Sequence, residues 1–134
     1  ASAAAAQFDI PLTHRSVARS VSFITGTTKE GVVDFDLNEL GRVDKTIVFY
    51  MASKNAQKIM ENCLKSGRDK QTPICAIENA GTKKAKIISG TLFELPQIVK
   101  SLDANGPVLL VLGEVVALAK INQIYCHQKI HSWA

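Results

Sequence analysis

Two short apolar runs constrain the fold of this 134-residue chain more than any other feature. Residues 47–51 (Ile-Val-Phe-Tyr-Met) and residues 108–112 (Val-Leu-Leu-Val-Leu) carry apolar side chains at consecutive positions. A strand of this kind presents apolar groups on both faces, so both faces of its sheet have to be covered by other parts of the protein. Three further segments have weaker strand patterns: residues 20–25, 74–78 and 86–93. In the last of these, Gly90 is expected to mark a bulge or bend.

Helical patterns fall between the predicted strands. Ser53 can cap a helix that ends before Gly67, where a left-handed residue is expected. The apolar positions of that helix have the spacing of one buried stripe: Ala56, Ile59, Met60, Cys63 and Leu64. Pro96 is expected to open a second helix, which ends before residues 105–106 (Asn-Gly).

Two shorter helical segments lie nearer the start of the chain. Asp36 and Glu39 have the three-residue spacing of a capping box, and residues 2–7 resemble the end of an earlier helix. Strands that alternate with helices are typical of an α/β fold, so this pattern alone predicts a largely parallel sheet with both faces covered. In such a sheet ligands bind where the carboxyl ends of the strands meet. The candidate segments are residues 25–27, 51–53, 79–81 and 113–114.

Length and composition fit a single globular domain. Apolar residues make up 46% and charged residues 21% of the chain, as in ordinary globular proteins. No apolar run approaches the roughly 18 residues of a membrane span, and the alanine-rich start lacks the features of a signal peptide. Three widely spaced cysteines favour reduced thiols, so a cytoplasmic location is expected. They are Cys63, Cys75 and Cys126.

The charge pattern and the motifs exclude several classes of function. A formal charge of +4 favours acidic partners, but with 6% aromatic residues, none alternating with basic ones, nucleic acid is not favoured. The sequence contains no Gly-x-Gly-x-x-Gly, no P-loop and no His-Glu-x-x-His motif. Cys126, His127 and His131 have a spacing that zinc can use, but they lack a fourth ligand. We therefore interpret them as part of a surface tail and expect no metal site.

Several segments, taken in order along the chain, resemble the tetrapyrrole methylase family. They are residues 11–15 (Pro-Leu-Thr-His-Arg), 18–21 (Ala-Arg-Ser-Val), 25–26 (Thr-Gly), 46–51 (Thr-Ile-Val-Phe-Tyr-Met), 72–73 (Thr-Pro), 77–80 (Ile-Glu-Asn-Ala), 89–92 (Ser-Gly-Thr-Leu) and 111–116 (Val-Leu-Gly-Glu-Val-Val). The resemblance is to the C-terminal domain of the members that methylate uroporphyrinogen III. It covers residues 1–118 and leaves residues 119–134 as an unmatched tail. It implies an α/β domain with a mixed five-stranded sheet and flanking helices.

The resemblance also implies a cofactor and site residues. In the family, S-adenosylmethionine lies in the cleft between two domains, and S-adenosylhomocysteine is its product. The positions that match its surroundings are Met51, Ala80 and Pro107, with core packing as the alternative for Met51. His14 and Arg15 are expected to face the tetrapyrrole substrate, whose carboxylates a guanidinium can bind with two hydrogen bonds. The catalytic residues are expected in the family's N-terminal domain, and none within this chain.

The implied reaction transfers methyl groups to carbons C2 and C7 of uroporphyrinogen III and gives precorrin-2, the precursor of siroheme and cobalamin. A homodimer is expected from the family, and this chain is expected to be inactive without an N-terminal domain. One departure is Thr27, because many family members have histidine after Thr-Gly. Two alternatives stay open: a non-catalytic binding or dimerisation module that kept the fold, and a relative that acts on ribosomal RNA.

Overall fold

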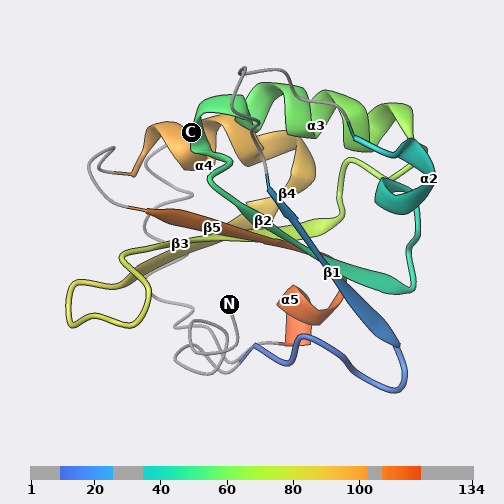
Figure 1. The fold of residues 1–134 in the computed structure, drawn as a ribbon, viewed down its shortest axis with the longest axis horizontal. Helices are drawn as coiled ribbons and strands as arrows, with labels where there is room; N and C mark the ends of the chain where they lie inside the picture. Colours follow the sequence, from blue (N-terminus) through green and yellow to red (C-terminus); the bar gives the residue numbers. More distant parts are fainter. Residues whose placement is uncertain (1–9, 26–34, 103–106, 119–134) are drawn as a thin grey trace.

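The computed structural model describes residues 10–25, 35–102 and 107–118. In this part of the chain, five strands form one sheet in the order β1-β2-β5-β3-β4 (Figure 1). The strands are β1 (Ser20–Thr25), β2 (Lys45–Tyr50), β3 (Pro73–Glu78), β4 (Lys86–Thr91) and β5 (Val108–Leu112). Each lies where the sequence pattern predicted a strand, and the mixed five-stranded sheet that the resemblance implied is confirmed.

The strand directions correct the expectation of a largely parallel sheet. Only β1 and β2 pair in parallel, whereas β5 is antiparallel to both β2 and β3, and β4 is antiparallel to β3. The physical reason lies in the connections. The segment between β3 and β4 is a short turn without a helix, and a turn of this kind joins antiparallel strands only. Strand β5 then fills the gap between β2 and β3 in the opposite direction.

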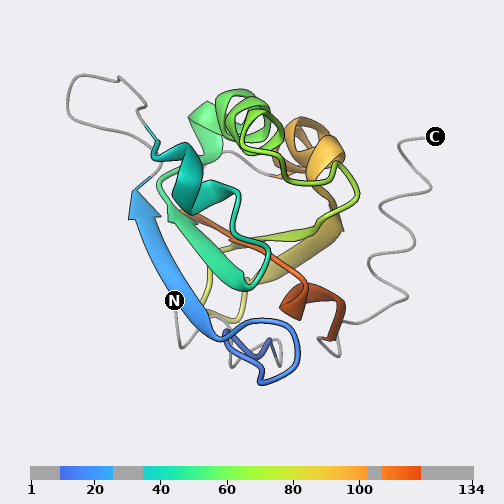
Figure 2. The same ribbon diagram turned by 90° about the vertical axis from the view of Figure 1, so that its right-hand side faces the viewer.

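Helices cover one face of the sheet (Figure 2). They are α2 (Leu37–Leu40), α3 (Ala56–Lys65) and α4 (Leu95–Lys100), with short 3-10 turns η1 (Ser53–Asn55) and η2 (Leu92–Glu94) before the last two. Their buried side chains pack against residues that alternate along the strands, such as Ile47, Phe49 and Leu110. This face contains the larger of two apolar clusters, and the buried residues of α3 come from the stripe that the sequence predicted.

The opposite face carries a second apolar cluster. Val48, Cys75 and Val111 point to this side, because successive side chains of a strand alternate between faces. Helix α5 (Val115–Leu118) and the segment that begins at Ile10 pack against them, on the other side of the sheet from the long helices (Figure 2). Cover on both faces, as predicted, is therefore confirmed.

Some details at the helix ends differ from the predictions. Ser53 begins η1 and does not cap α3; the N-cap position of α3 is Asn55, whose side chain makes no capping hydrogen bond to the helix. Gly67 follows α3 with a φ of +102°, as predicted. Pro96 lies in the first turn of α4, also as predicted. Asp36 caps α2 through a hydrogen bond from the Asn38 backbone N–H.

Gly90 is a second difference, because it does not form a bulge. It pairs with Ile74 in an uninterrupted register between β3 and β4. A Cβ atom at this position would lie 3.1 Å from Ile98 Cδ1 and 3.2 Å from Glu94 Oε1. Glycine therefore allows α4 and the capping box of η2, formed by Thr91 and Glu94, to pack closely on the strand.

Some predictions fall outside the described residues. These are the helix at residues 2–7, the helix stop at residues 105–106, Thr27, and the Cys126, His127 and His131 group. No helix in the described part of the chain has the length and apolar character needed to cross a membrane.

Candidate functional site

Three strand ends and two strand starts meet at one edge of the sheet. Strands β1, β2 and β3 end there, and β4 and β5 begin there, because the first three run opposite to the last two. Tyr50 pairs with Leu109, and Glu78 pairs with Val108, so the residues just beyond these positions are neighbours. The start of β5 and the turn after β3 lie together at the left of Figure 1.

This edge brings together the three residues that the resemblance assigned to the cofactor: Met51, Ala80 and Pro107. The Asn79 backbone N–H donates a hydrogen bond of 3.2 Å to the Pro107 carbonyl, which ties the end of β3 to the start of β5. We call this region the Met51 edge and define it by Met51, Glu78, Asn79, Ala80 and Pro107. Residues 113–114, which a parallel sheet would have placed here, lie at the opposite edge because β5 is antiparallel to β2.

Met51 combines an exposed side chain with an uncommon backbone conformation. Its φ is +52°, in the left-handed region, and 69% of its surface is exposed. Core packing is therefore excluded as the reason for a methionine here. A non-glycine residue in this conformation costs about 1–2 kcal/mol, so the rest of the fold must hold it in place.

The turn after β3 holds Ala80 at the same edge. Asn79 also has a positive φ, of +54°, which asparagine tolerates better than most residues. Its carbonyl accepts hydrogen bonds from the Thr82 backbone N–H (3.2 Å) and the Thr82 hydroxyl (2.7 Å). Ala80 is half-buried in this turn and packs against the second apolar cluster.

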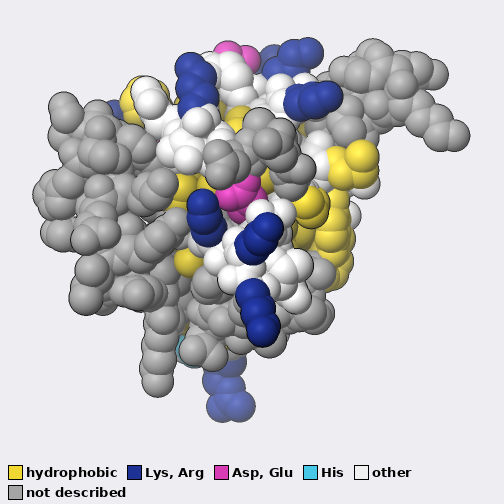
Figure 3. Space-filling view, turned by 90° about the vertical axis from the view of Figure 1, so that its left-hand side faces the viewer, with side chains coloured by type: hydrophobic (Ala, Val, Ile, Leu, Met, Phe, Trp, Pro, Cys, Tyr) yellow, Lys and Arg dark blue, Asp and Glu magenta, His cyan; other side chains and the backbone are white. Residues whose placement is uncertain are grey.

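Glu78 is the one member of this edge that the sequence analysis did not single out. It is 1% exposed, and its Oε1 atom has no hydrogen-bond partner among the described residues. A signal existed in the sequence, because Glu78 is a charged residue at the end of an otherwise apolar strand. Figure 3 views this side of the molecule and shows basic side chains around an acidic group, with hydrophobic side chains nearby. Lys83 and Lys84 are exposed in the adjoining turn, and Lys86 is exposed at the start of β4.

His14 and Arg15 lie elsewhere. They belong to a tight loop that is closed by reciprocal backbone hydrogen bonds between His14 and Ala18, of 2.7 and 2.8 Å. The Arg19 backbone N–H donates to the Asp44 carbonyl at the start of β2, so this loop is at the edge opposite to Met51. Six-residue strands span roughly 20 Å. The structure therefore does not bring His14 and Arg15 together with Met51, Ala80 and Pro107.

The loop surrounds a shallow basic pocket of about 430 Å³, lined by Thr13, His14, Arg15, Ala18 and Arg19. The His14 Nδ1 atom accepts a hydrogen bond of 3.1 Å from the Ser16 backbone N–H, so Nε2 is the ring nitrogen without an intramolecular role in this loop. Arg15 and Arg19 are both exposed. Sequence reasoning missed Arg19, because only the turn at residues 14–18 places it beside Arg15.

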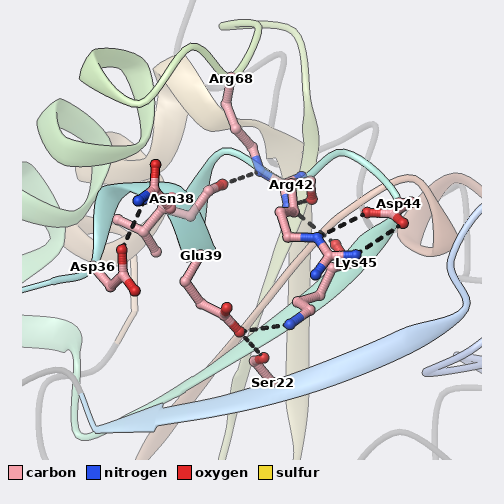
Figure 4. A network of polar contacts seen from close by, with 9 residues as sticks. Ser22, Asp36, Asn38, Glu39, Arg42, Asp44, Lys45 and Arg68 are labelled. Atoms are coloured by element: carbon pink, nitrogen blue, oxygen red, sulfur yellow. Dashed lines mark hydrogen bonds and ion pairs between the residues drawn. The ribbon is translucent and has the colours of Figure 1, made fainter.

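A polar network fixes the segment between α2 and β2 (Figure 4). The Glu39 carboxylate accepts hydrogen bonds from Lys45 Nζ, at 2.7 Å, and from the Ser22 hydroxyl. These two bonds lower the pKa of Glu39, and the bond from Lys45 has the larger effect. The buried Arg68 guanidinium donates to the carbonyls of Leu40 (2.6 Å), Arg42 (2.6 Å) and Lys45 (3.0 Å). This network has a structural role and is separate from both candidate sites.

Other titratable groups give no further site. Cys63 is buried in the apolar cluster, and this burial raises the pKa of its thiol to about 12, so it is inert. Within residues 10–25, 35–102 and 107–118, no three His, Cys, Asp or Glu side chains are grouped so that they could hold a metal ion.

Comparison with protein families and known sequences gives consistent results. The family model for Tetrapyrrole (Corrin/Porphyrin) Methylases matches residues 1–96. The siroheme synthase of Chromobacterium violaceum is 41% identical over 119 residues, which are 89% of this chain and 25% of that protein. The siroheme synthase of Pseudomonas paraeruginosa is 42% identical over 118 residues, 88% of this chain and 25% of that protein. The chain thus spans about a quarter of the length of these curated relatives.

Comparison with solved structures agrees with the sequence comparisons. Uroporphyrin-III C-methyltransferase from Thermus thermophilus, in its native form, has a TM-score of 0.71 and 30% identity, and the match covers 86% of this chain and 48% of that chain. The same enzyme complexed with S-adenosylhomocysteine also has a TM-score of 0.71 and 30% identity, over 86% of this chain and 50% of that one. A cobalt-precorrin-4 methyltransferase, 22% identical with a TM-score of 0.75 over 86% of this chain and 48% of that one, shares the fold. The chain belongs to the tetrapyrrole methylase family.

Proposed function

We propose that this chain is the C-terminal domain of an S-adenosylmethionine-dependent methyltransferase that methylates uroporphyrinogen III at C2 and C7 to give precorrin-2. The observation that carries this proposal is the meeting of Met51, Ala80 and Pro107 at one edge of the sheet, although they are far apart in the sequence. The siroheme synthases and the uroporphyrin-III C-methyltransferase to which the chain is similar support the same activity.

The residues of the Met51 edge fit a nucleoside cofactor. Met51 offers an exposed, polarisable thioether, Ala80 leaves its backbone open, and Glu78 has an acceptor atom without a partner. S-adenosylmethionine, when bound, supplies a methyl group on an electrophilic sulfonium. In this proposal Met51, Ala80 and Pro107 bind and orient the cofactor, while the proton-transfer residues belong to an N-terminal domain. The chain alone is then inactive.

The basic pocket is proposed to bind the substrate. Uroporphyrinogen III carries eight carboxylates, and the guanidinium of Arg15 and the Nε2 atom of His14 are suitable donors for them. Because the pocket lies at the edge opposite to Met51, it would hold a peripheral carboxylate and not the carbon that reacts. Replacing Arg15 with alanine should weaken the binding of uroporphyrin, measured by fluorescence, and leave S-adenosylhomocysteine binding unchanged. Unchanged uroporphyrin binding would remove Arg15 from the substrate site.

The cellular location, the oligomeric state and the class of substrate follow from the same proposal. Cys63 is a free and buried thiol, as suits a reducing cytoplasmic compartment. We also propose that the intact enzyme is a homodimer, as in the family, and that it acts on a tetrapyrrole and not on RNA. Size-exclusion chromatography with light scattering tests the homodimer directly.

Calorimetric titration with S-adenosylhomocysteine tests the cofactor site. The folded chain should bind the ligand saturably, and Ala80→Leu should weaken binding strongly because the larger side chain blocks the approach of the ligand to the backbone. Ala117→Leu is the matched control, since it adds the same volume at an exposed position beyond the opposite edge. Near-UV circular dichroism checks that each variant is folded. Equal affinities for the two variants would contradict the proposed cofactor site.

A further inference from the structure

Glu78 is a buried acidic residue without a complete set of partners. It is the last residue of β3, and its neighbours across the sheet are Val108 on β5 and Lys86 on β4. Val108 is buried and apolar, so it offers no hydrogen bond from its side chain. The Oε1 atom of Glu78 receives no hydrogen bond from the described residues.

Such an arrangement is unfavourable for folding. Buried polar atoms in native proteins almost always have a hydrogen-bond partner, and an exception calls for an explanation. A carboxyl group that exchanges water for an apolar environment loses hydration that a single partner does not replace. The buried hydroxyl of Thr46 is also without a partner, but it is neutral and lies near the opposite end of the sheet, close to Gly113.

The position of Glu78 suggests what completes it. Glu78 directly precedes Asn79 and Ala80, whose turn forms part of the Met51 edge, and its paired residue Val108 directly follows Pro107. Met51 and Pro107 are exposed and Ala80 is half-buried, and these three residues of the proposed cofactor site lie next to the segment that carries the unpaired acceptor. A ligand at this edge that contains hydroxyl or ammonium donors would satisfy it.

We infer that Glu78 is a ligand-binding residue, whose Oε1 atom accepts a hydrogen bond from a donor group of the nucleoside cofactor. This inference rests on the proposed function, because it takes the Met51 edge to be the cofactor site. Two donors of the cofactor share the required chemistry, the hydroxyls of the ribose and the ammonium of the amino-acid part. The structure assigns Glu78 a role in binding, with a cost to the stability of the unliganded protein.

Lys86 provides the main alternative explanation. It lies opposite Glu78 in the register of β3 and β4, so an ion pair between the two side chains in solution would give Glu78 a purely structural role. In that case Glu78→Gln and Lys86→Met would both lower the melting temperature. A ligand-binding role predicts a different result, because Glu78→Gln then replaces a buried carboxyl group with an amide, whose oxygen is a weaker acceptor for the donor of the ligand.

The test compares wild type, Glu78→Gln, Lys86→Met and the control Glu61→Gln, an exposed acid on α3. Thermal unfolding at pH 7 is measured without ligand, and affinity is measured by calorimetry. Glu78→Gln should unfold at a temperature no lower than wild type and bind S-adenosylhomocysteine roughly ten-fold more weakly, as expected when an amide oxygen replaces the stronger acceptor of a carboxyl group. Lys86→Met and Glu61→Gln should keep wild-type affinity.

A second ligand separates the two donors. 5′-Methylthioadenosine keeps the ribose but lacks the amino acid, so weaker binding of both ligands by Glu78→Gln identifies the ribose, and weaker binding of S-adenosylhomocysteine alone identifies the ammonium. Unchanged affinity of Glu78→Gln for both ligands, or a melting temperature lowered to the same extent as in Lys86→Met, overturns the inference about Glu78 only. No binding by the wild-type chain overturns the cofactor site as well.

Discussion

Met51 illustrates how much a single position can reveal once its conformation is known. A methionine that follows four apolar residues is typical of a core position. The structure instead places it beyond the end of β2, exposed and with a positive φ. Sequence reasoning could not find this conformation, because it depends on how the chain leaves the sheet toward η1. The exposure of Met51 rules out the core-packing alternative, and the cofactor contact that the resemblance implies for it stays a prediction.

Replacing Met51 with glycine separates its backbone from its side chain. Glycine adopts the left-handed conformation without a steric penalty, so Met51→Gly should leave the free energy of unfolding unchanged or raise it by up to about 1 kcal/mol. The same change should weaken S-adenosylhomocysteine binding, because the thioether is lost. Urea denaturation and calorimetry measure the two effects. A loss of about 2 kcal/mol or more would show that the side chain is packed in solution, against the structure described above.

At the scale of elements, the agreement with the sequence is closest where apolar periodicity is strong. All five strands and helix α3 were predicted, because burial imposes their alternation or stripe. The capping details were predicted less well. Asp36 was correctly placed as a cap, but Glu39, three residues later, bonds to Ser22 and Lys45. These partners come from other strands, and no local spacing rule contains them.

The contacts of Glu39 predict a pH-dependent contribution to stability. Its pKa is lowered from the ordinary value of 4.5, because Lys45 and Ser22 hydrogen-bond to the ionised carboxylate. Glu39 therefore stabilises the fold above pH 4.5, and this contribution is lost as the pH falls through its lowered pKa. Glu39→Gln should melt about 1–4 °C below wild type at pH 7, because the pair is partly exposed.

The same difference should disappear in acid, where the wild-type carboxyl is protonated as well. Melting temperatures of both proteins, measured between pH 7 and pH 3, check this, with Glu61→Gln as the control for an exposed acid. A difference that stays constant over this range would show that the hydrogen bonds matter and the charge of Glu39 does not.

At the scale of the whole molecule, strand direction decides which residues meet. The sequence pattern alone predicted a largely parallel sheet, and this would have placed residues 113–114 beside Met51. The antiparallel β5 instead brings Pro107 to that edge. The direction of β5 could not be predicted from residue patterns, because it depends on pairings with segments far apart in the sequence. For the same reason, the separation of the basic pocket from the Met51 edge became visible only in the fold.

This separation gives the proposed cofactor site at the Met51 edge a clear test, since the two candidate sites lie at opposite edges. The most direct measurement is a titration of the isotopically labelled chain with S-adenosylhomocysteine, followed by amide chemical shifts. We expect the amide signals of Met51, Asn79, Ala80 and Val108 to shift together and saturate with one dissociation constant, while those of His14, Arg15 and Arg19 stay unchanged. Shifts confined to the basic pocket, or no shifts at millimolar ligand in a folded chain, would contradict it.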